Sequence, residues 1–141
     1  MPLNTPPAKI LARWLIAQGV FSLAGDWPIY VSSLPASPDL AASIYDLPGV
    51  PDGRIMTTGE RIEHPRIQIK LRALTYPVGW TKLKDVEAAL NSILRSEIAI
   101  VGDQTYSIQS ARTGNPFHIG YEPKNRRPLF TINSRLTINP V

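Results

Sequence analysis

The sequence predicts an α+β fold, in which an antiparallel or mixed sheet of four to six strands packs against two amphipathic helices. Two segments carry apolar residues at helical spacing, and several others alternate apolar with polar residues as half-buried strands do. The chain has 141 residues, the size of one domain with one core, so residues 1–141 are expected to form a single domain. Burying all the apolar faces together requires helices layered on a sheet.

The first helix is expected over residues 6–18. Thr5 precedes it, and Pro6 and Pro7 are its first residues. This is typical of a helix start because a hydroxyl can accept hydrogen bonds from free amides and proline lacks the N–H that would stay unpaired. Gly19 can adopt the left-handed conformation that ends a helix. Apolar residues recur at helical spacing and predict a buried stripe: Ile10, Leu11, Trp14, Leu15 and Ala17.

The same segment shares features with a secretory signal peptide. Lys9 and Arg13 precede an apolar run, and the small residue Ala24 lies at its end. Gln18 and Gly19 interrupt that run. We therefore expect an amphipathic helix of a cytoplasmic protein, with secretion as the alternative.

The middle of the chain is rich in turn residues. Short strands are expected at 27–31 and 41–45, and the 14 prolines of the chain fall mostly between periodic segments. Residues 46–65 combine turn residues, mixed charge and scattered apolar groups. They predict a long, proline-pinned loop, which in a compact domain is usually functional or disordered.

The clearest strand is expected over residues 66–74, followed by the second helix over 82–95. In the strand, Ile67, Ile69 and Leu71 are expected to face the core. The polar residues that alternate with them are expected to face outward: Arg66, Gln68, Lys70 and Arg72. Thr81 is expected to cap the helix. Its apolar face is formed by Leu83, Val86, Leu90, Ile93 and Leu94.

Alternating patterns predict further strands in the last third of the chain. Residues 98–101 and 105–109 read as a hairpin around Gly102, with Tyr106 and Ile108 facing inward. Two more strands follow, at 117–121 and around 130–138, and in the last of these the inward residues are expected to be Phe130, Ile132, Leu136 and Ile138.

Residues able to support catalysis are few. There is no cysteine, which excludes thiolate chemistry and disulfides, and the two histidines, His64 and His118, have no metal-ligand spacing. Glu60 and Glu63 flank Arg61 without an apolar shield to raise either carboxyl pKa, and no phosphate-loop or nucleophile-elbow motif occurs. We expect no enzymatic activity, no metal and no cofactor.

Docking residues are better represented. Exposed aromatics and arginines anchor protein interfaces, so a subunit interface is expected around the loop at 46–65 and one tryptophan: Arg54, Met56, Glu60, Arg61, Glu63 and Trp80. The net charge of +4 comes from the end of the chain, because residues 1–123 balance. That end predicts a basic docking patch: Lys124, Arg126, Arg127 and Arg135. Such a patch fits an acidic protein neighbour or, alternatively, DNA.

The order of these segments resembles the tail terminator type of minor capsid proteins in long-tailed (siphovirus-like) phages. The resemblance rests on Pro48–Met56, on His64–Arg72 before a helix, and on Phe117–Glu122 before Arg127–Asn133. It covers about two thirds of the chain. The resemblance implies a hexameric ring at the head-proximal end of the tail tube that ends tube polymerisation and joins the tail to the head connector.

The resemblance also implies partners and a location. The partners would be copies of the same chain, the tail tube protein and a head–tail connector or completion protein, with DNA passing through the lumen without specific binding and no contact with a membrane. The protein would be made in the host cytoplasm and end in the virion tail or neck. Two alternatives remain open at this point: a head-completion or connector subunit, and a small DNA-binding module.

Overall fold

The computed structural model describes residues 5–23, 25–54, 61–93 and 97–140, without the side chains of residues 50–54, 61–63 and 140. Within these ranges it confirms the α+β fold, with two helices on one mixed sheet whose seven strands exceed the four to six expected. The helices are α1 (Pro7–Ala17) and α2 (Tyr76–Asn91). The strands are β1 (Ile29–Val31), β2 (Ala41–Arg54), β3 (Arg61–Arg72), β4 (Glu97–Val101), β5 (Gln104–Thr113), β6 (Phe117–Tyr121) and β7 (Pro128–Pro140).

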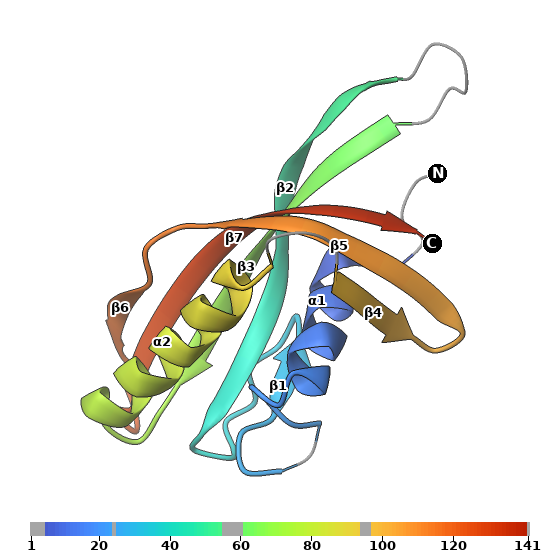
Figure 1. Ribbon diagram of the computed structural model, residues 1–141. Helices are drawn as coiled ribbons and strands as arrows, with labels where there is room; N and C mark the ends of the chain where they lie inside the picture. Colours follow the sequence, from blue (N-terminus) through green and yellow to red (C-terminus); the bar gives the residue numbers. More distant parts are fainter. Residues whose placement is uncertain (1–4, 24, 55–60, 94–96, 141) are drawn as a thin grey trace.

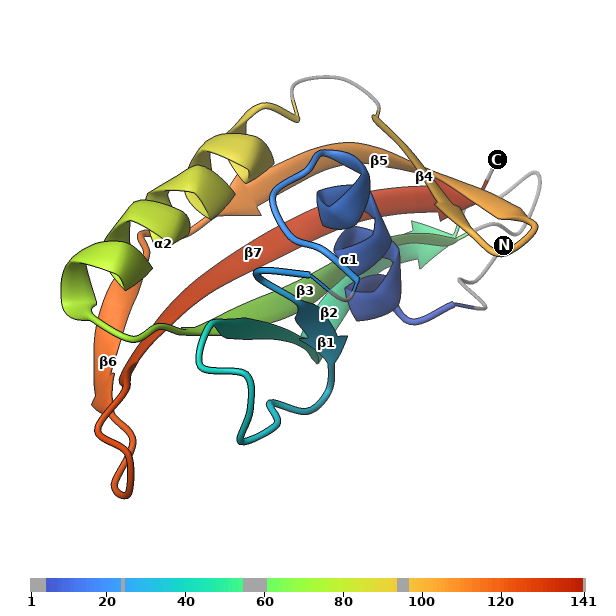
Figure 2. The ribbon, with the colours of Figure 1, turned by 90° about the horizontal axis from the view of Figure 1, so that it is seen from below.

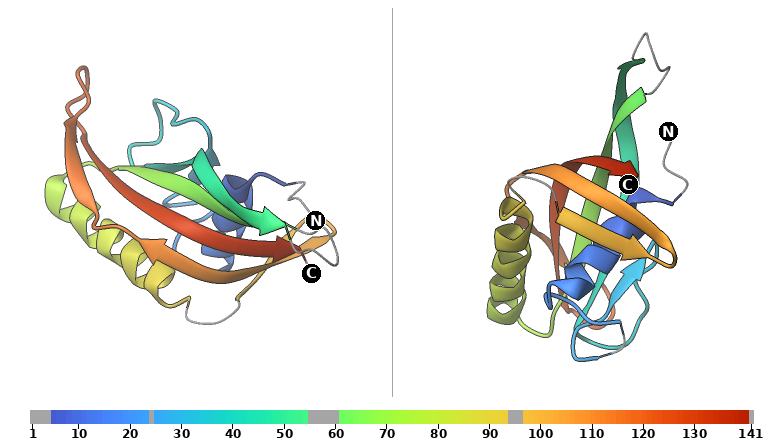
Figure 3. Two further views of the ribbon diagram at one scale, coloured as in Figure 1. Left: turned by 90° about the horizontal axis from the view of Figure 1, so that it is seen from above. Right: turned by 45° about the vertical axis from the view of Figure 1, so that its right-hand side comes forward.

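The sheet has one helix-covered face and one bare face. Its strand order is β1-β2-β3-β7-β5-β4, and β6 pairs with β7 beside the end of β5. Only the β1–β2 pair is parallel among the described strands. Both helices lie on the same face (Figures 1 and 2), and the view of Figure 3, left, looks onto the opposite face. Neither described helix has the length and apolar run needed to cross a bilayer.

The core lies between the helices and the sheet, as the alternating patterns predict. Ile67, Ile69 and Leu71 of β3 are fully buried. The residues expected to face inward from the hairpin and from the last strand are also buried, and so is the apolar stripe of α1 except for Ala17, which is exposed. Local periodicity therefore identified most of the core.

The start of α1 differs from the expectation. The Thr5 hydroxyl does not cap the helix but bonds to the Tyr106 hydroxyl at 2.6 Å. Asp46 of β2 takes the capping role, because its Oδ1 accepts a hydrogen bond from the Ala8 N–H at 2.9 Å. A carboxylate at this end of a helix also interacts favourably with the helix dipole.

The second helix begins earlier than predicted. It starts at Tyr76 rather than near residue 82, and its first turn includes Pro77, which costs little there because the first amides of a helix have no intrahelical partner. Thr81 lies inside the helix, so the cap predicted there is wrong. Its hydroxyl donates back to the Pro77 carbonyl at 3.0 Å.

The predicted loop at 46–65 is wrong over most of its length. Residues 46–54 continue β2 and residues 61–65 begin β3, while residues 55–60 lie outside the described part of the chain. The turn residues lie at register irregularities between Leu47 and Val50 and between Pro51 and Arg54. Irregularities of this kind accommodate proline and glycine without a lost ladder bond. A Cβ at Gly49 would lie 2.5 Å from the His64 carbonyl oxygen, so close strand approach requires glycine there.

The remaining strands follow the predictions more closely. The hairpin is confirmed as β4 and β5, and Gly102 in its turn has a φ of +63° that favours glycine. The strand expected at 27–31 is confined to Ile29–Val31, and the last strand is longer than expected, Pro128–Pro140. Long β7 lies at the centre of the sheet and pairs with β3, β5 and β6.

Candidate interaction surfaces

The predicted subunit-interface residues fall into two separate places. Arg54 and Arg61 are opposite each other where β2 and β3 extend beyond the rest of the fold (Figure 1), and Glu63 is opposite Pro51 in the same hairpin. Met56 and Glu60 lie outside the described residues, and the side chains of the other three are not described. The structure therefore places part of the predicted set on one projecting hairpin. Their role in an interface stays a prediction.

Trp80 is on α2, away from that hairpin. It is half-buried, and its ring stacks on Tyr76 with centroids 6.2 Å apart and planes 7° from parallel. The Lys84 ammonium lies 5.3 Å from the Trp80 ring centroid, within the range of a cation–π contact. Trp80 thus belongs to an aromatic group on α2 rather than to the β2–β3 hairpin.

The four residues of the predicted basic patch do not come together. Lys124 and Arg126 are exposed in the turn between β6 and β7, and Arg135 is exposed further along β7. Arg127 is buried, with 6% of its surface exposed. Its guanidinium donates to both carboxylate oxygens of Glu122, at 2.6 and 3.3 Å, and to Asp39 at 2.9 Å. Arg127 is therefore a structural cation and is not available to an external partner.

A second buried arginine completes this ionic cluster. Arg72, at the end of β3, is 1% exposed and lies 3.7 Å from the Glu122 carboxylate. Its guanidinium also donates to the backbone carbonyls of Pro35 at 2.5 Å, of Asp39 at 3.3 Å, and of Pro38. Burial is the largest effect on the pKa of Arg72 and lowers it from the usual value, and the nearby Arg127 charge acts in the same direction. The cluster fastens the segment before β2 to the end of the sheet.

The bare face of the sheet carries a row of arginines that the sequence did not predict to lie together. Arg135 of β7 is opposite Arg66 of β3 on one side and Arg112 of β5 on the other, and all three are exposed. Neighbouring strands are roughly 4.8 Å apart, so the row is about 10 Å long. No carboxylate of the described residues forms an ion pair with these three arginines. We name these residues the arginine row.

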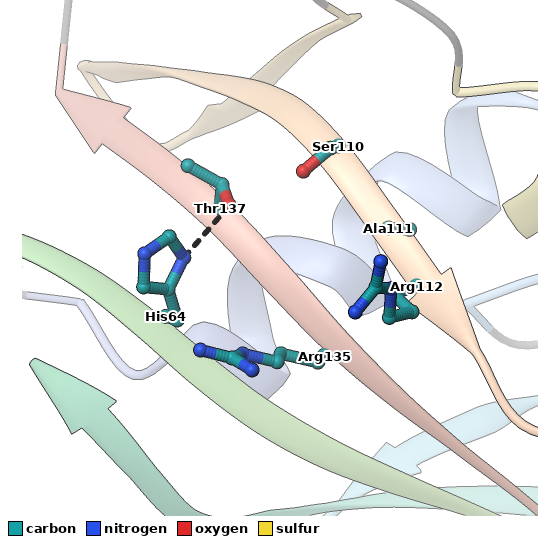
Figure 4. A pocket seen from close by; sticks show the side chains of 6 residues that line it. All are labelled: His64, Ser110, Ala111, Arg112, Arg135 and Thr137. Carbon is teal, nitrogen blue, oxygen red and sulfur yellow. Dashed lines mark hydrogen bonds between the residues drawn. The ribbon is translucent and has the colours of Figure 1, made fainter.

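A shallow cavity of about 480 Å³ adjoins the arginine row (Figure 4). Arg112 and Arg135 line it together with small and polar side chains from three strands. His64 Nδ1 and Thr137 Oγ1 are 3.0 Å apart at its edge. The cavity offers cations and hydroxyl groups, which suit an anionic ligand or an acidic surface. Among the described residues no group of three metal-ligating side chains comes together.

Three aromatic side chains that the sequence did not predict to lie together form one corner of the molecule. Tyr76, at the start of α2, contacts His118 of β6 edge to face with centroids 5.1 Å apart, and His118 contacts Tyr121 in the same way at 4.9 Å. Both Tyr76 and Tyr121 are about half exposed, with 44% and 52% of their surfaces accessible. The signal available in the sequence was the clustering of aromatics on either side of turns.

Comparisons with known proteins identify the family. No match is found among curated proteins. One solved structure, whose name states no activity, is 14% identical, covers 93% of this chain and 89% of its own, and has a TM-score of 0.49. The family model described as bacteriophage tail terminator protein matches residues 15–140. The chain therefore belongs to the bacteriophage tail terminator family, whose members are structural components of phage tails.

Proposed function

We propose that this protein forms a hexameric ring at the head-proximal end of the phage tail tube. The ring ends tube polymerisation and joins the tube to the head connector, and the role is structural rather than enzymatic. The observation that carries the proposal is the match of the tail terminator family to residues 15–140, nearly the whole chain. The partners are further copies of the chain, the tail tube protein and a connector or completion protein.

The proposed mechanism is steric and thermodynamic. One face of the ring must complement the last layer of tube subunits closely enough to compete with the next incoming layer. The other face must lack the surface that a tube layer presents, so that no further layer binds. Because each subunit must contact a neighbour through two different patches, the ring closes only if the rotation per subunit divides a full turn.

Two features of the fold support such a role. The β2–β3 hairpin projects from the body and can reach a neighbouring subunit (Figure 1), which is where Arg54, Arg61 and Glu63 were expected to act. The bare sheet face presents polar side chains and the arginine row, a surface suited to another protein layer. DNA passes through the lumen without specific binding in this proposal.

The alternative of a DNA-binding module loses support. It relied on Lys124, Arg126, Arg127 and Arg135, but Arg127 is occupied by Glu122 and Asp39, and Arg135 lies apart from the β6–β7 turn. A protein in the virion tail or neck, made in the host cytoplasm, fits the family assignment better.

Electron microscopy of particles made without this protein tests the proposal. Overlong tails, or tails without heads, are the expected result, and restoring the protein from a plasmid should restore tails of normal length joined to heads. Tails of normal length attached to heads in its absence would overturn the terminator role. Label on the head portal rather than at the tube end would instead indicate a head-completion subunit.

A further inference from the structure

Exposed apolar residues gather at one corner of the molecule. Among the described residues ten large apolar side chains are exposed, and six of them lie at the start of α2 or on β6. We call these six the corner surface: Leu74, Tyr76, Val78, Phe117, Ile119 and Tyr121. Their exposed fractions range from 41% to 55%. Large exposed apolar patches on soluble proteins usually mark sites of protein association.

The corner surface is held rigidly by the fold. The pairing of β6 with β7 shifts register between His118 and Gly120, so that one extra residue is inserted there. Because of this bulge His118 and Tyr121 share one side of the strand, where both rings contact each other next to Tyr76. Phe130, fully buried, supports Tyr76 from below with centroids 5.6 Å apart. Aromatic anchors that are already ordered lose little conformational entropy on binding.

A second exposed apolar surface lies on strand β4. Ile98 and Ile100 are 51% and 63% exposed, while Ala99 between them is buried against the core. Among the described strands β4 pairs only with β5, so no described strand covers its outer edge. An open edge with exposed apolar side chains is prone to pair with another strand, and natural proteins usually cover or charge such edges.

The two surfaces lie at opposite ends of the sheet. β6 is at one end and β4 at the other in both views of Figures 1 and 2. One molecule therefore cannot bring them together. Two copies can. If each copy uses its two surfaces on two different neighbours, the contact is head to tail and can close into a ring.

The charges beside the two surfaces are complementary. Glu97 and Asp103 are the only charged residues of the segment 97–108 that carries β4. The turn after β6 carries Lys124 and Arg126, both exposed. A contact between the two surfaces would thus place Lys124 and Arg126 near Glu97 and Asp103, which favours this pairing over contact between two copies of the corner surface.

We propose that the corner surface of one copy docks onto the β4 edge of the next copy. The open edges of β6 and β4, each belonging to a five-residue strand, pair so that the sheet continues from subunit to subunit. Phe117 then lies beside Ile98 and Ile100, because all three project from the bare face of the sheet. This inference rests on the proposed ring and identifies which surfaces of this chain build it.

Cysteine cross-linking tests the pairing directly, because the native chain has no cysteine to give background. The variants Ile100→Cys and Phe117→Cys place thiols on the two surfaces, and Leu23→Cys is a matched control on another exposed apolar residue, 61% accessible. A disulfide needs Cα atoms about 4.4–6.8 Å apart, so a short bismaleimide is used in parallel to tolerate a shift in register. An oxidant, which forms the disulfide, and the bismaleimide are applied separately to purified protein and to purified virions.

The expected result is cross-linking only where both surfaces carry a thiol. A mixture of Ile100→Cys and Phe117→Cys should yield covalent dimers at least about tenfold faster than Ile100→Cys mixed with Leu23→Cys. The double variant should give a ladder that stops at the ring size. Equal rates in the two mixtures would overturn the pairing. Efficient self-linking of either single variant would overturn it too, because it requires a two-fold rather than a head-to-tail contact.

Two variants of Tyr121 that carry opposite charges give a second test. Tyr121→Glu brings a carboxylate toward Glu97 and Asp103 of the neighbour, whereas Tyr121→Lys removes the same ring with the opposite charge. We expect the glutamate variant to assemble at least tenfold less than the lysine variant at low salt. Equal assembly would contradict the proposed orientation.

The two proposals fail in distinguishable ways. If the double-cysteine variant, kept reduced, restores tails of normal length but virions show no cross-link after oxidation, the pairing is wrong and the terminator role stands. If the cross-link forms but loss of the protein leaves tails normal, the pairing stands and the terminator role is wrong.

Discussion

The close packing of Gly79 against Phe130 predicts the sign of the change in the free energy of unfolding caused by Gly79→Ala. Gly79 lies in α2 and is buried against β7, and a Cβ built on it would lie 2.1 Å from Phe130 Cε2 and 2.7 Å from Cζ. Carbon atoms in good contact are about 3.5–4.0 Å apart, so the ring would have to withdraw by more than about 1 Å. Phe130 is completely buried, so no open space adjoins it on the solvent side.

Two opposing terms decide the effect of Gly79→Ala. Alanine is favoured over glycine inside a helix by about 0.8–1 kcal/mol. Overpacking a filled core costs about 1–3 kcal/mol. We therefore expect Gly79→Ala to lower the free energy of unfolding by about 1 kcal/mol. The conservative glycine-to-alanine change should destabilise this helix although it improves helix propensity.

A double-mutant cycle with Phe130→Leu isolates the clash. With the ring gone, Gly79→Ala should be neutral or should raise the free energy of unfolding by up to about 1 kcal/mol. The coupling energy between the two positions is then about 1–3 kcal/mol. Urea unfolding followed by tryptophan fluorescence and far-UV circular dichroism supplies the free energies, at several protein concentrations so that any assembly is detected.

An exposed site on the same helix calibrates the propensity term. Ala88 is exposed on α2, so Ala88→Gly should cost about 0.8–1 kcal/mol with no change in packing. If Gly79→Ala stabilises the native protein by that same amount, the close approach of α2 to β7 is not real and the reasoning is refuted.

Three further predictions concern charged side chains. Arg127→Gln should lower the free energy of unfolding by about 1–3 kcal/mol because Glu122 loses its main partner, while Arg126→Gln, at an exposed position, should change it by less than about 0.5 kcal/mol. Equal effects of the two variants would contradict a structural role for Arg127. Arg135→Gln should raise the free energy of unfolding by about 0.2–1 kcal/mol at low salt, because it removes repulsion from Arg66 and Arg112, and the gain should shrink in 1 M salt. A lower free energy of unfolding at low salt would argue against that repulsion. Burial lowers the pKa of Lys82, so the unfolded chain binds the ammonium proton more tightly than the folded chain does, and the free energy of unfolding should rise as the pH approaches 10.5 from below. In Lys82→Met, unfolding measured across that pH range should show a smaller rise.

The sequence predicted elements whose signal is local. The stripe of α1 and the alternation in β3 and β7 repeat at the helical or strand period, and burial follows from that repeat alone. The start of α2 was missed because Thr81 looks like a cap, although Pro77 is equally compatible with a first helical turn. Local chemistry allowed both starts, and packing of Gly79 against Phe130 agrees with the earlier one.

The β2–β3 hairpin was mistaken for a loop because its prolines and glycines normally interrupt strands. In the structure Pro48, Gly49 and Gly53 occupy register irregularities and Pro51 borders one. Such irregularities depend on the partner strand and cannot be detected in a single segment. The parallel pairing of β1 with β2 has no local signal either. Pairing partners and register were therefore the main information that sequence patterns lacked.

The charged surfaces depended on contacts between distant residues. Arg127 and Arg126 are neighbours of the same type, yet Arg127 is buried because Asp39, 88 positions away, and Glu122 accept its hydrogen bonds. Arg66 was correctly expected to face outward, whereas Arg72, expected on the same side, is buried. The place of Arg66 in the arginine row follows only from the register of β3, β7 and β5. A residue's type predicted charge, and the fold determined which charges remain available.

The bulge in β6 could not be predicted from the alternating pattern either, and it determines the shape of the surface in the proposed assembly. Strict alternation through Phe117, Ile119 and Tyr121 would put all three side chains on one side of the strand, away from α2. The shift after His118 instead turns Tyr121 toward Tyr76 and leaves Phe117 on the bare face. The corner surface therefore extends around the edge of the sheet, and deleting Ile119 should remove the bulge and return Tyr121 to the bare face. If cross-linking between Ile100→Cys and Phe117→Cys persists unchanged after that deletion, the aromatic side of the corner surface contributes nothing to the subunit contact.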